Sequence, residues 1–205
     1  MVVGFGLIAA GCAIEPKPFV INNYRLFEGP IIELILLSIV LWIGRIRGWS
    51  LATFGFKISW KSTAGGLLLF VIAEVVLWGV WTCTEAIHVQ PLRVIFDGTA
   101  PFILFCSVIN AVFEEVLEAG YLISALSRFG MWPAILAGAI FRACYHLFIG
   151  LNTAMGLFAF GLVFGWVYWR WRQLWPLVIA HALADFFGMF YLSHEWQQHI
   201  IHHAA

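Results

Sequence analysis

The sequence predicts an all-α protein, a polytopic bundle of about six transmembrane helices, and its composition points to this fold in two ways. Hydrophobic residues make up 62% of the 205 residues and charged residues only 11%, whereas soluble chains carry roughly 45–50% apolar and about 25% charged residues. The few charges are clustered, so long apolar runs lie between them. Eleven Lys and Arg balance eleven Asp and Glu, which leaves no net charge to attract nucleic acid. We therefore expect a membrane protein that binds no nucleic acid.

Six apolar runs come near the length of about 20 residues that a helix needs to cross a bilayer. They cover residues 30–46, 64–84, 100–126, 131–149, 154–169 and 174–192. The first run opens with a proline in its first turn and with Glu33 near the positive helix end, and both favour a helix start. The fifth contains Gly161 and Gly165 in a GxxxG step, which suits close helix packing. Because no soluble domain, repeat or linker interrupts the runs, the sequence predicts one membrane domain over residues 1–205.

The two ends of the chain and its cysteines have plainer interpretations. Residues 1–14 are apolar but short for a span, and we expect an interfacial or partly inserted segment. The tail contains HEWQQH between His194 and His199, which is one residue longer than the zinc-binding HExxH pattern, so its histidines would not share a helix face. The four cysteines lie far apart and form no CxxC, and we expect them to act as small apolar core residues.

Positive charges predict how the helices are oriented, because cytoplasmic loops carry an excess of Lys and Arg. Seven of the eleven basic residues lie in three alternate loops, at residues 45–63, 127–130 and 170–173. We therefore predict a multi-pass protein of the cell membrane, with these three loops in the cytoplasm and the C-terminus outside.

A few ionisable residues interrupt the apolar runs. Each costs about 2.5–3.5 kcal/mol at mid-membrane, so such a residue is expected to face the protein interior. They are Glu74, the group Glu114, Glu115 and Glu118, the pair Arg142 and His146, and the pair His181 and Asp185. Residues four apart share a helix face, and this spacing relates Glu114 to Glu118 and also relates the members of both pairs. We interpret Glu74 as an inter-helix contact, and we expect the other residues to form one site.

Two hydrolytic routes are open to such a site. A carboxylate such as Glu114 beside an imidazole such as His146 can serve as a general base that activates water. His181 would then stabilise the oxyanion, with Asp185 protonated or orienting the imidazole. In the other route, Glu114, His146, His181 and Asp185 would hold a divalent metal such as zinc. No serine, threonine or cysteine pairs obviously with either histidine, so a nucleophilic route is less well supported.

The same residues resemble the motifs of the CPBP family of intramembrane proteases, which includes CAAX prenyl endopeptidases and bacterial abortive-infection proteins. The first motif, EExxxR, corresponds to residues 114–119. The second, an aromatic residue or arginine four positions before a histidine, corresponds to Arg142 and His146. The third, HxxxN or HxxxD, corresponds to His181 and Asp185. The resemblance covers about residues 100–190.

This resemblance implies an all-helical intramembrane endopeptidase, now generally regarded as glutamic-type although long described as a metalloprotease. Carried over by position, the roles are water activation by Glu114 with His146, oxyanion stabilisation by His181 with Asp185, and positioning of the site by Glu115. We therefore expect hydrolysis of a peptide bond in a membrane-associated or lipidated peptide. Membrane lipids and the peptide substrate would be the partners, and this route requires no cofactor.

One departure from the family pattern bears on activity. The arginine of the first motif is replaced by Ala119, and Glu118 occupies a position that is usually apolar or aromatic. Losing a cation beside buried carboxylates changes the charge state of the site. Either Arg142 restores the balance from the neighbouring helix by pairing with Glu115 or Glu118, or the site is degenerate. In the second case the protein would act without cutting, as a membrane scaffold, chaperone or immunity factor.

The predicted site residues lie at different depths along their helices. At a rise of 1.5 Å per residue, Glu114 and His146 lie roughly 20–24 Å from the cytoplasmic helix ends, whereas His181 lies about 13 Å from its own. Straight parallel helices would hold these residues apart. A tilted helix, or a helix that starts outside the membrane, would close the gap.

Overall fold

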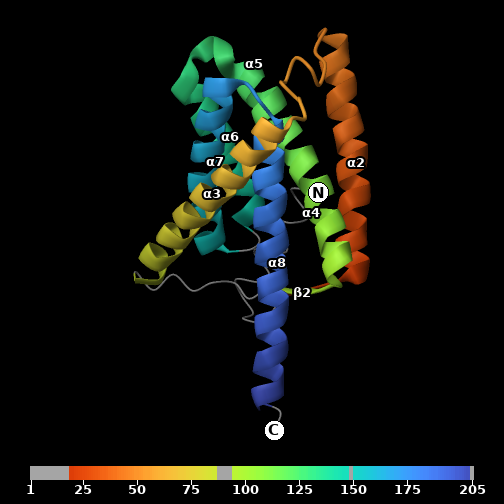
Figure 1. The fold of residues 1–205 in the computed structure, drawn as a ribbon, viewed down its shortest axis with the longest axis vertical. Helices are drawn as coiled ribbons and strands as arrows, with labels where there is room; N and C mark the ends of the chain where they lie inside the picture. Colours follow the sequence, from red (N-terminus) through yellow and green to blue (C-terminus); the bar gives the residue numbers. More distant parts are fainter. Residues whose placement is uncertain (1–18, 87–93, 148–149, 204–205) are drawn as a thin grey trace.

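The computed structural model describes residues 19–86, 94–147 and 150–203, and Figure 1 traces them as a bundle of long helices. In chain order the elements are β1 (Phe19–Asn22), α2 (Asn23–Ile46), α3 (Trp60–Ala86), β2 (Val94–Asp97), α4 (Ala100–Glu115), the π-helix η1 (Val116–Ile123), α5 (Ser124–Leu126), the 3-10 turn η2 (Ser127–Phe129), α6 (Met131–His146), α7 (Leu151–Trp171) and α8 (Trp175–His203). The predicted all-α bundle is confirmed. The predicted N-terminal interfacial segment lies outside the described residues.

Helix lengths agree only in part with the prediction of six spans. By length and composition, four helices of the described part could cross a membrane, namely Glu28–Ile46, Trp60–Thr84, Ala100–Phe129 and Leu151–Trp171. The apolar part of α8, Trp175–Phe190, is shorter, and α6 has 16 residues. Beyond its apolar part, α8 continues as a helix through the predicted tail to His203.

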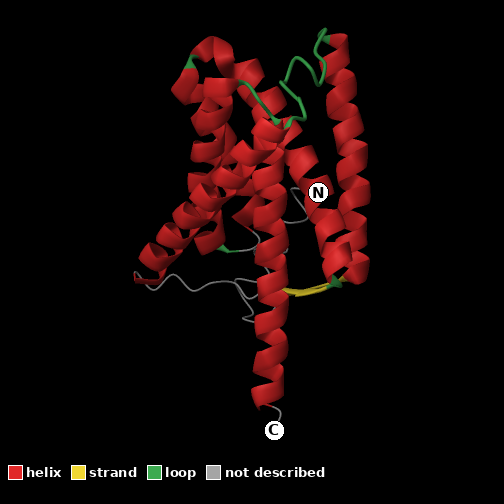
Figure 2. Ribbon diagram, in the orientation of Figure 1, coloured by secondary structure: helices red, strands yellow, loops and turns green. Residues whose placement is uncertain are grey.

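A short pair of strands joins two helix starts, and the sequence analysis did not predict it. β1 and β2 pair in parallel, with Phe19 opposite Val94. Because β1 leads into α2 and β2 precedes α4, the pair lies at the foot of these two helices (Figure 2). Strands of four residues are too short for an alternating pattern to stand out from an apolar background.

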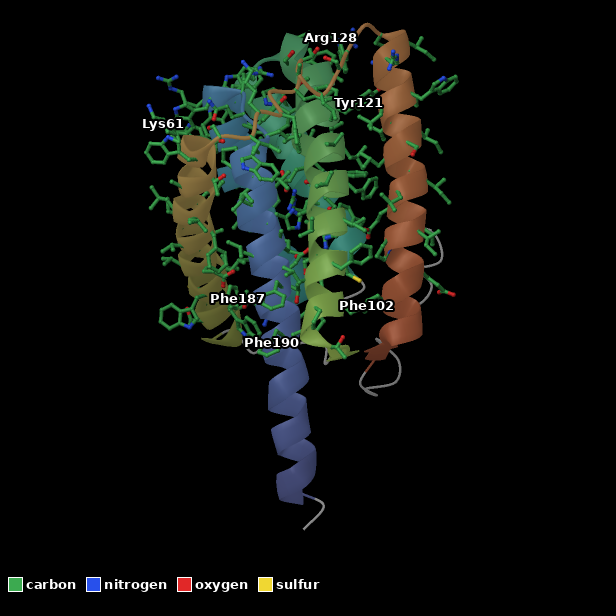
Figure 3. All side chains as sticks on the ribbon, turned by 45° about the vertical axis from the view of Figure 1, so that its right-hand side comes forward. Lys61, Phe102, Tyr121, Arg128, Phe187 and Phe190 are labelled. Carbon is green, nitrogen blue, oxygen red and sulfur yellow. The ribbon has the colours of Figure 1, made fainter. Side chains whose placement is uncertain are left out.

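The helices divide into an outer and an inner group. Only 11% of the apolar window of α2 and 17% of that of α3 is buried, against 44% for the windows in Ala100–Phe129 and in α7. Side chains project outward from the two outer helices in Figure 3. Large apolar residues of these helices are exposed, among them Trp42 at 65% and Trp78 at 71%. Apolar side chains facing outward are what lipid requires.

Helices α6 and α7 pack closely through the predicted glycine step. A Cβ atom added at Gly161 would lie 2.9 Å from the Cα atom of Ala139, and one added at Gly165 would lie 2.9 Å from Cγ2 of Ile135. Side chains at these positions would push α6 away. The GxxxG step therefore serves helix packing here.

The start of α8 lies under a loop, and this position accounts for the depth of His181. In Figure 1, α8 begins below the ends of α6 and α7 at that side of the bundle. The Leu174 amide donates a hydrogen bond to the Gly55 carbonyl at 3.1 Å. Gly55 has a positive φ of 74°, and a Cβ there would lie 1.8 Å from the Arg172 carbonyl oxygen, so only glycine fits. The loop thus fixes α8 deep enough for His181 to reach the level of Glu114.

Candidate active site

Three helical segments bring the predicted ionisable residues together inside the bundle. Glu114 and Glu115 end α4, and Glu118 lies in the π-helix that follows. Arg142 comes from α6 and His181 from α8. All five are buried, with Glu115 at 0% and Arg142 at 1% exposure. A π-helix changes the angular spacing of side chains and occurs frequently at functional sites.

Arg142 is the cation at the centre of this cluster. Its Nε atom donates to Oε2 of Glu118 at 2.6 Å, and its Nη2 atom donates to Oε1 of Glu115 at 2.6 Å. The guanidinium also lies over the rings of Phe160 and Phe164 of α7, at 5.0 and 5.8 Å from their centroids. This is the geometry of the first interpretation above, in which a cation from α6 replaces the one that Ala119 lacks.

Tyr145 connects two of the glutamates, and the sequence analysis did not name it. Its hydroxyl oxygen lies 2.6 Å from Oε2 of Glu114 and 2.6 Å from Oε1 of Glu118. Its position three residues after Arg142 was the available signal, because residues three apart share a helix face. A tyrosine in an apolar helix is also a common membrane-interface residue, so the sequence alone did not distinguish the two roles.

Glu115 orients the His181 ring. The Nδ1 atom of His181 lies 2.7 Å from Oε1 of Glu115, and a carboxylate only accepts hydrogen bonds, so Nδ1 carries a proton. The other ring nitrogen, Nε2, then faces Oε2 of Glu114 at 3.6 Å and Oδ1 of Asp185 at 3.5 Å. Glu114 and Glu115 thus reach the same imidazole at its two nitrogens, although they point about 100° apart around the helix.

Asp185 lies at the more open side of the cluster. Its side chain is 21% exposed, and its Oδ2 atom accepts a hydrogen bond from Nδ2 of Asn110 at 2.8 Å. From the sequence, Asp185 is predicted either to be protonated or to orient His181. Glu115 contacts Nδ1 of the ring and Asp185 lies on the Nε2 side, so the predicted role of Asp185 stays a prediction.

His146 is the last residue of α6, one turn after Arg142. Its Nδ1 atom lies 3.0 Å from the carbonyl oxygen of Arg142. Because a carbonyl only accepts, Nδ1 carries the proton and a neutral ring keeps the Nε2 lone pair. This tautomer is compatible with a base, and the predicted role of His146 in activating water together with Glu114 stays a prediction.

Two further glutamates come from the outer helices. Glu33 of α2 has a buried Oε2 atom without a hydrogen-bond partner among the described residues, and α2 packs against α4, which carries Glu114. The sequence analysis interpreted Glu33 only as a helix-start residue. Glu74 of α3 is half-buried, and no hydrogen bond or ion pair is described for it, so its predicted inter-helix contact has no support.

The fit of a metal ion can be tested on the side chains themselves. Among the described residues, no group of three or more His, Cys, Asp or Glu side chains is arranged to hold one. In the predicted ligand set, Nδ1 of His146 lies at a carbonyl of its own helix, and Oδ2 of Asp185 accepts a hydrogen bond from Asn110. These two hydrogen bonds do not involve Nε2 of His146 or Oδ1 of Asp185, so the metal route stays a prediction.

A small cavity lies beside the cluster. Its lining includes Glu115, Glu118 and Arg142 together with Ala119, and its space suits about one water molecule. Among the described residues, the buried Oε2 atom of Glu115 has no hydrogen-bond partner. The cavity therefore lies where an arginine at position 119 would extend its side chain.

The region that contains the site matches a known protein family. Residues 96–187 match the family described as type II CAAX prenyl endopeptidase, Rce1-like. The match begins just before α4 and ends in α8, so it contains every predicted site residue and leaves out Glu33 and Glu74. The comparisons find no matching curated protein and no matching solved structure.

Proposed function

Because residues 96–187 carry the Rce1-like domain of the type II CAAX prenyl endopeptidases, we propose that this membrane protein is a glutamic-type intramembrane endopeptidase. The observation that carries the proposal is the setting of one imidazole nitrogen. Glu114 and Asp185 face Nε2 of His181 at 3.6 and 3.5 Å, distances too long for good direct hydrogen bonds. A water molecule or a substrate carbonyl belongs in such a space.

Water is activated by Glu114, whose carboxylate faces this space, together with His146, the partner that the family resemblance implies. Glu114, with His146 beside it, accepts a proton from water while the water oxygen attacks the carbonyl carbon of the scissile peptide. The O–H bond breaks as the C–O bond forms, and the carbonyl oxygen becomes an oxyanion. Glu114 then returns the proton to the leaving nitrogen as the C–N bond breaks. No metal and no covalent enzyme intermediate takes part.

The oxyanion is stabilised by His181. With Nδ1 donating to Glu115, an imidazolium also donates from Nε2, on the side where the reacting carbonyl lies. Carboxylates at both nitrogens balance the imidazolium charge, and Arg142 balances Glu115 and Glu118 in turn. A donor placed in advance at the developing charge is the largest single contribution in many hydrolases.

The substrate is a peptide that reaches the bundle from the membrane. The site lies among helices rather than at a loop surface, and its more open side is at Asp185. The family description names prenyl endopeptidases of CAAX sequences, so we propose a lipidated C-terminal peptide as the substrate class. An apolar lipid anchor would hold such a peptide at the depth of the site.

The test uses the purified full chain in liposomes. It is incubated with a prenylated peptide that ends in a CAAX sequence and with the same peptide lacking the prenyl group, and the products are weighed by mass spectrometry. We expect one internal cut, faster for the prenylated peptide. Products no more abundant than in protein-free liposomes would contradict the proposal and would favour the scaffold interpretation.

A chelator arm of the same experiment addresses the metal route. Because no step uses a metal, we expect EDTA to leave the cleavage rate unchanged. Loss of activity with EDTA and recovery with zinc would overturn the glutamic mechanism while keeping the peptidase.

A further inference from the structure

The hydroxyl of Tyr145 makes more short contacts than its own proton can serve. It lies 2.6 Å from Oε2 of Glu114 and 2.6 Å from Oε1 of Glu118. A phenol carries one O–H donor, and an ionised carboxylate carries none. Contacts of this length are hydrogen bonds, and each of them needs one proton between the two oxygens. If both carboxylates were ionised, one contact would press two acceptor oxygens together in a buried site.

A second proton resolves this conflict. When one of the two glutamates is protonated, its O–H donates to the phenol oxygen, and the phenol donates to the other glutamate. The three groups are then a carboxylic acid, a phenol and a carboxylate, and each of the two short contacts has one donor and one acceptor. The proton has two places, on Glu114 or on Glu118, and the Tyr145 hydroxyl contacts both carboxyl groups.

The groups around these three side chains are consistent with one retained proton. Arg142 contacts Glu115 and Glu118 at 2.6 Å and approaches Glu114 to 3.9 Å. His181 faces Glu115 and Glu114, while Asp185 and His146 lie at the open side. Glu33 lies on α2, which packs against α4. With one arginine among three clustered glutamates, adding one proton leaves two negative charges instead of three.

We propose that Tyr145 relays one proton between Glu114 and Glu118, so that Glu118 holds it while Glu114 activates water. In the transfer, the carboxyl proton of Glu114 moves to the phenol oxygen as the phenol proton moves to Oε1 of Glu118. One O–H bond breaks for each that forms, and the phenol stays neutral. Glu114 is then ionised and accepts a proton from water, as in the proposed function, on which the catalytic part of this inference rests. Tyr145 and Glu118 are positioning residues, because they act through Glu114.

Infrared spectroscopy of the purified protein tests the shared proton without any activity. A protonated carboxyl group has its own C=O stretching band. We expect this band to weaken by one carboxyl group in Glu118→Gln and equally in Glu114→Gln, because a glutamine amide donates to Tyr145 and removes the need for a proton. The exposed Glu28 provides the control, and Glu28→Gln leaves the band unchanged. An unchanged band in both cluster variants would overturn the proposal.

Kinetics on the cleaved peptide test the relay itself. We expect Glu118→Gln and Tyr145→Phe each to lower kcat about 10²-fold, with KM changed by no more than about twofold, because the base but not the binding surface is affected. Because the two residues act as one unit, kcat of the double variant should be no lower than kcat of the less active single variant. Multiplied losses, or a change in KM alone, would contradict the relay.

The two proposals fail in different ways. If the wild type cuts no peptide but the carboxyl band weakens in Glu118→Gln, the proposed function is contradicted and the shared proton is supported. If the wild type cuts the peptide but the band is the same in the wild type and in both cluster variants, the shared proton is contradicted and the endopeptidase is supported.

Discussion

Arg142 supplies from α6 a cation to the buried glutamates of this site. The family pattern places an arginine at position 119, four residues after Glu115, and this chain has alanine there. Arg142 reaches Glu115 and Glu118 from α6 instead, with 1% of its residue surface exposed. The replacement also explains why Glu118 is tolerated, because a third buried acid has a cation at 2.6 Å.

Removing Arg142 should therefore destabilise the fold. Arg142→Ala leaves two buried carboxylates without their cation, and breaking a buried pair in this way costs about 3–5 kcal/mol. We expect a markedly lower unfolding midpoint in detergent for Arg142→Ala than for Arg128→Ala, which removes an exposed arginine. Equal midpoints for the two variants would show that Arg142 does not hold the cluster.

Restoring the arginine at the family's own position should rescue this variant. Ala119 lines the cavity beside Glu115 and Glu118, and removing the Arg142 side chain enlarges that space. We expect Arg142→Ala with Ala119→Arg to regain most of the lost stability and part of the cleavage rate, measured on the same peptide. A double variant no better than Arg142→Ala would contradict the exchange of positions.

The prediction of individual residues from sequence depended on how unusual each one is in lipid. Glu114, Arg142 and His181 stood out because ionisable groups are costly in a membrane. Tyr145 did not, since its phenol also suits an interface, and its role depends on two helices meeting at one atom. Glu33 was visible as an acid, but its packing against the site depends on α2 lying beside α4, which spacing along one helix does not encode.

At the scale of elements, periodicity and apolar length predicted the helices, while contacts distant in sequence determined their depth. The six runs predicted from composition correspond to the six long helical segments of the described chain. The depth mismatch of His181 disappeared because the loop at Gly55 holds the start of α8 inside the bundle. That contact joins residues more than a hundred positions apart, and no local sequence pattern predicts it.

The glycine step between α6 and α7 offers a test at this scale. Gly161→Ala places a methyl group 2.9 Å from the backbone of Ala139, and such overpacking costs about 1–3 kcal/mol. Gly79 of α3 has nothing within 4 Å of the added atom, so Gly79→Ala is the matched control. We expect a lower unfolding midpoint for Gly161→Ala alone, and equal midpoints would contradict the packing described here.

At the scale of the whole molecule, the three basic loops belong to one end of the bundle. Lys61, at the start of α3, and Arg128, in the turn before α6, both lie near that end in Figure 3. The Gly55–Leu174 hydrogen bond joins the first of these loops to the turn before α8. A shared end is what the charge pattern requires, and we propose that this end faces the cytoplasm.

Labelling of single cysteines in intact cells tests that orientation. In a variant whose four native cysteines are replaced by alanine, Lys57→Cys reports on the basic end and Thr99→Cys on the turn before α4, and both native residues are exposed. We expect an impermeant thiol reagent to label Thr99→Cys in intact cells and Lys57→Cys only after lysis. The reverse pattern would place the basic loops outside.

The most direct measurement is the rate at which Glu114→Gln in liposomes cleaves the prenylated peptide that wild type cuts. Glutamine keeps the shape of the side chain and a hydrogen bond to Tyr145 but cannot take a proton from water, so kcat should fall about 10²–10⁴-fold. Glu74→Gln, which removes a half-buried glutamate outside the cluster, should retain the wild-type rate. A Glu114→Gln protein that cuts as fast as wild type would contradict water activation by this carboxylate.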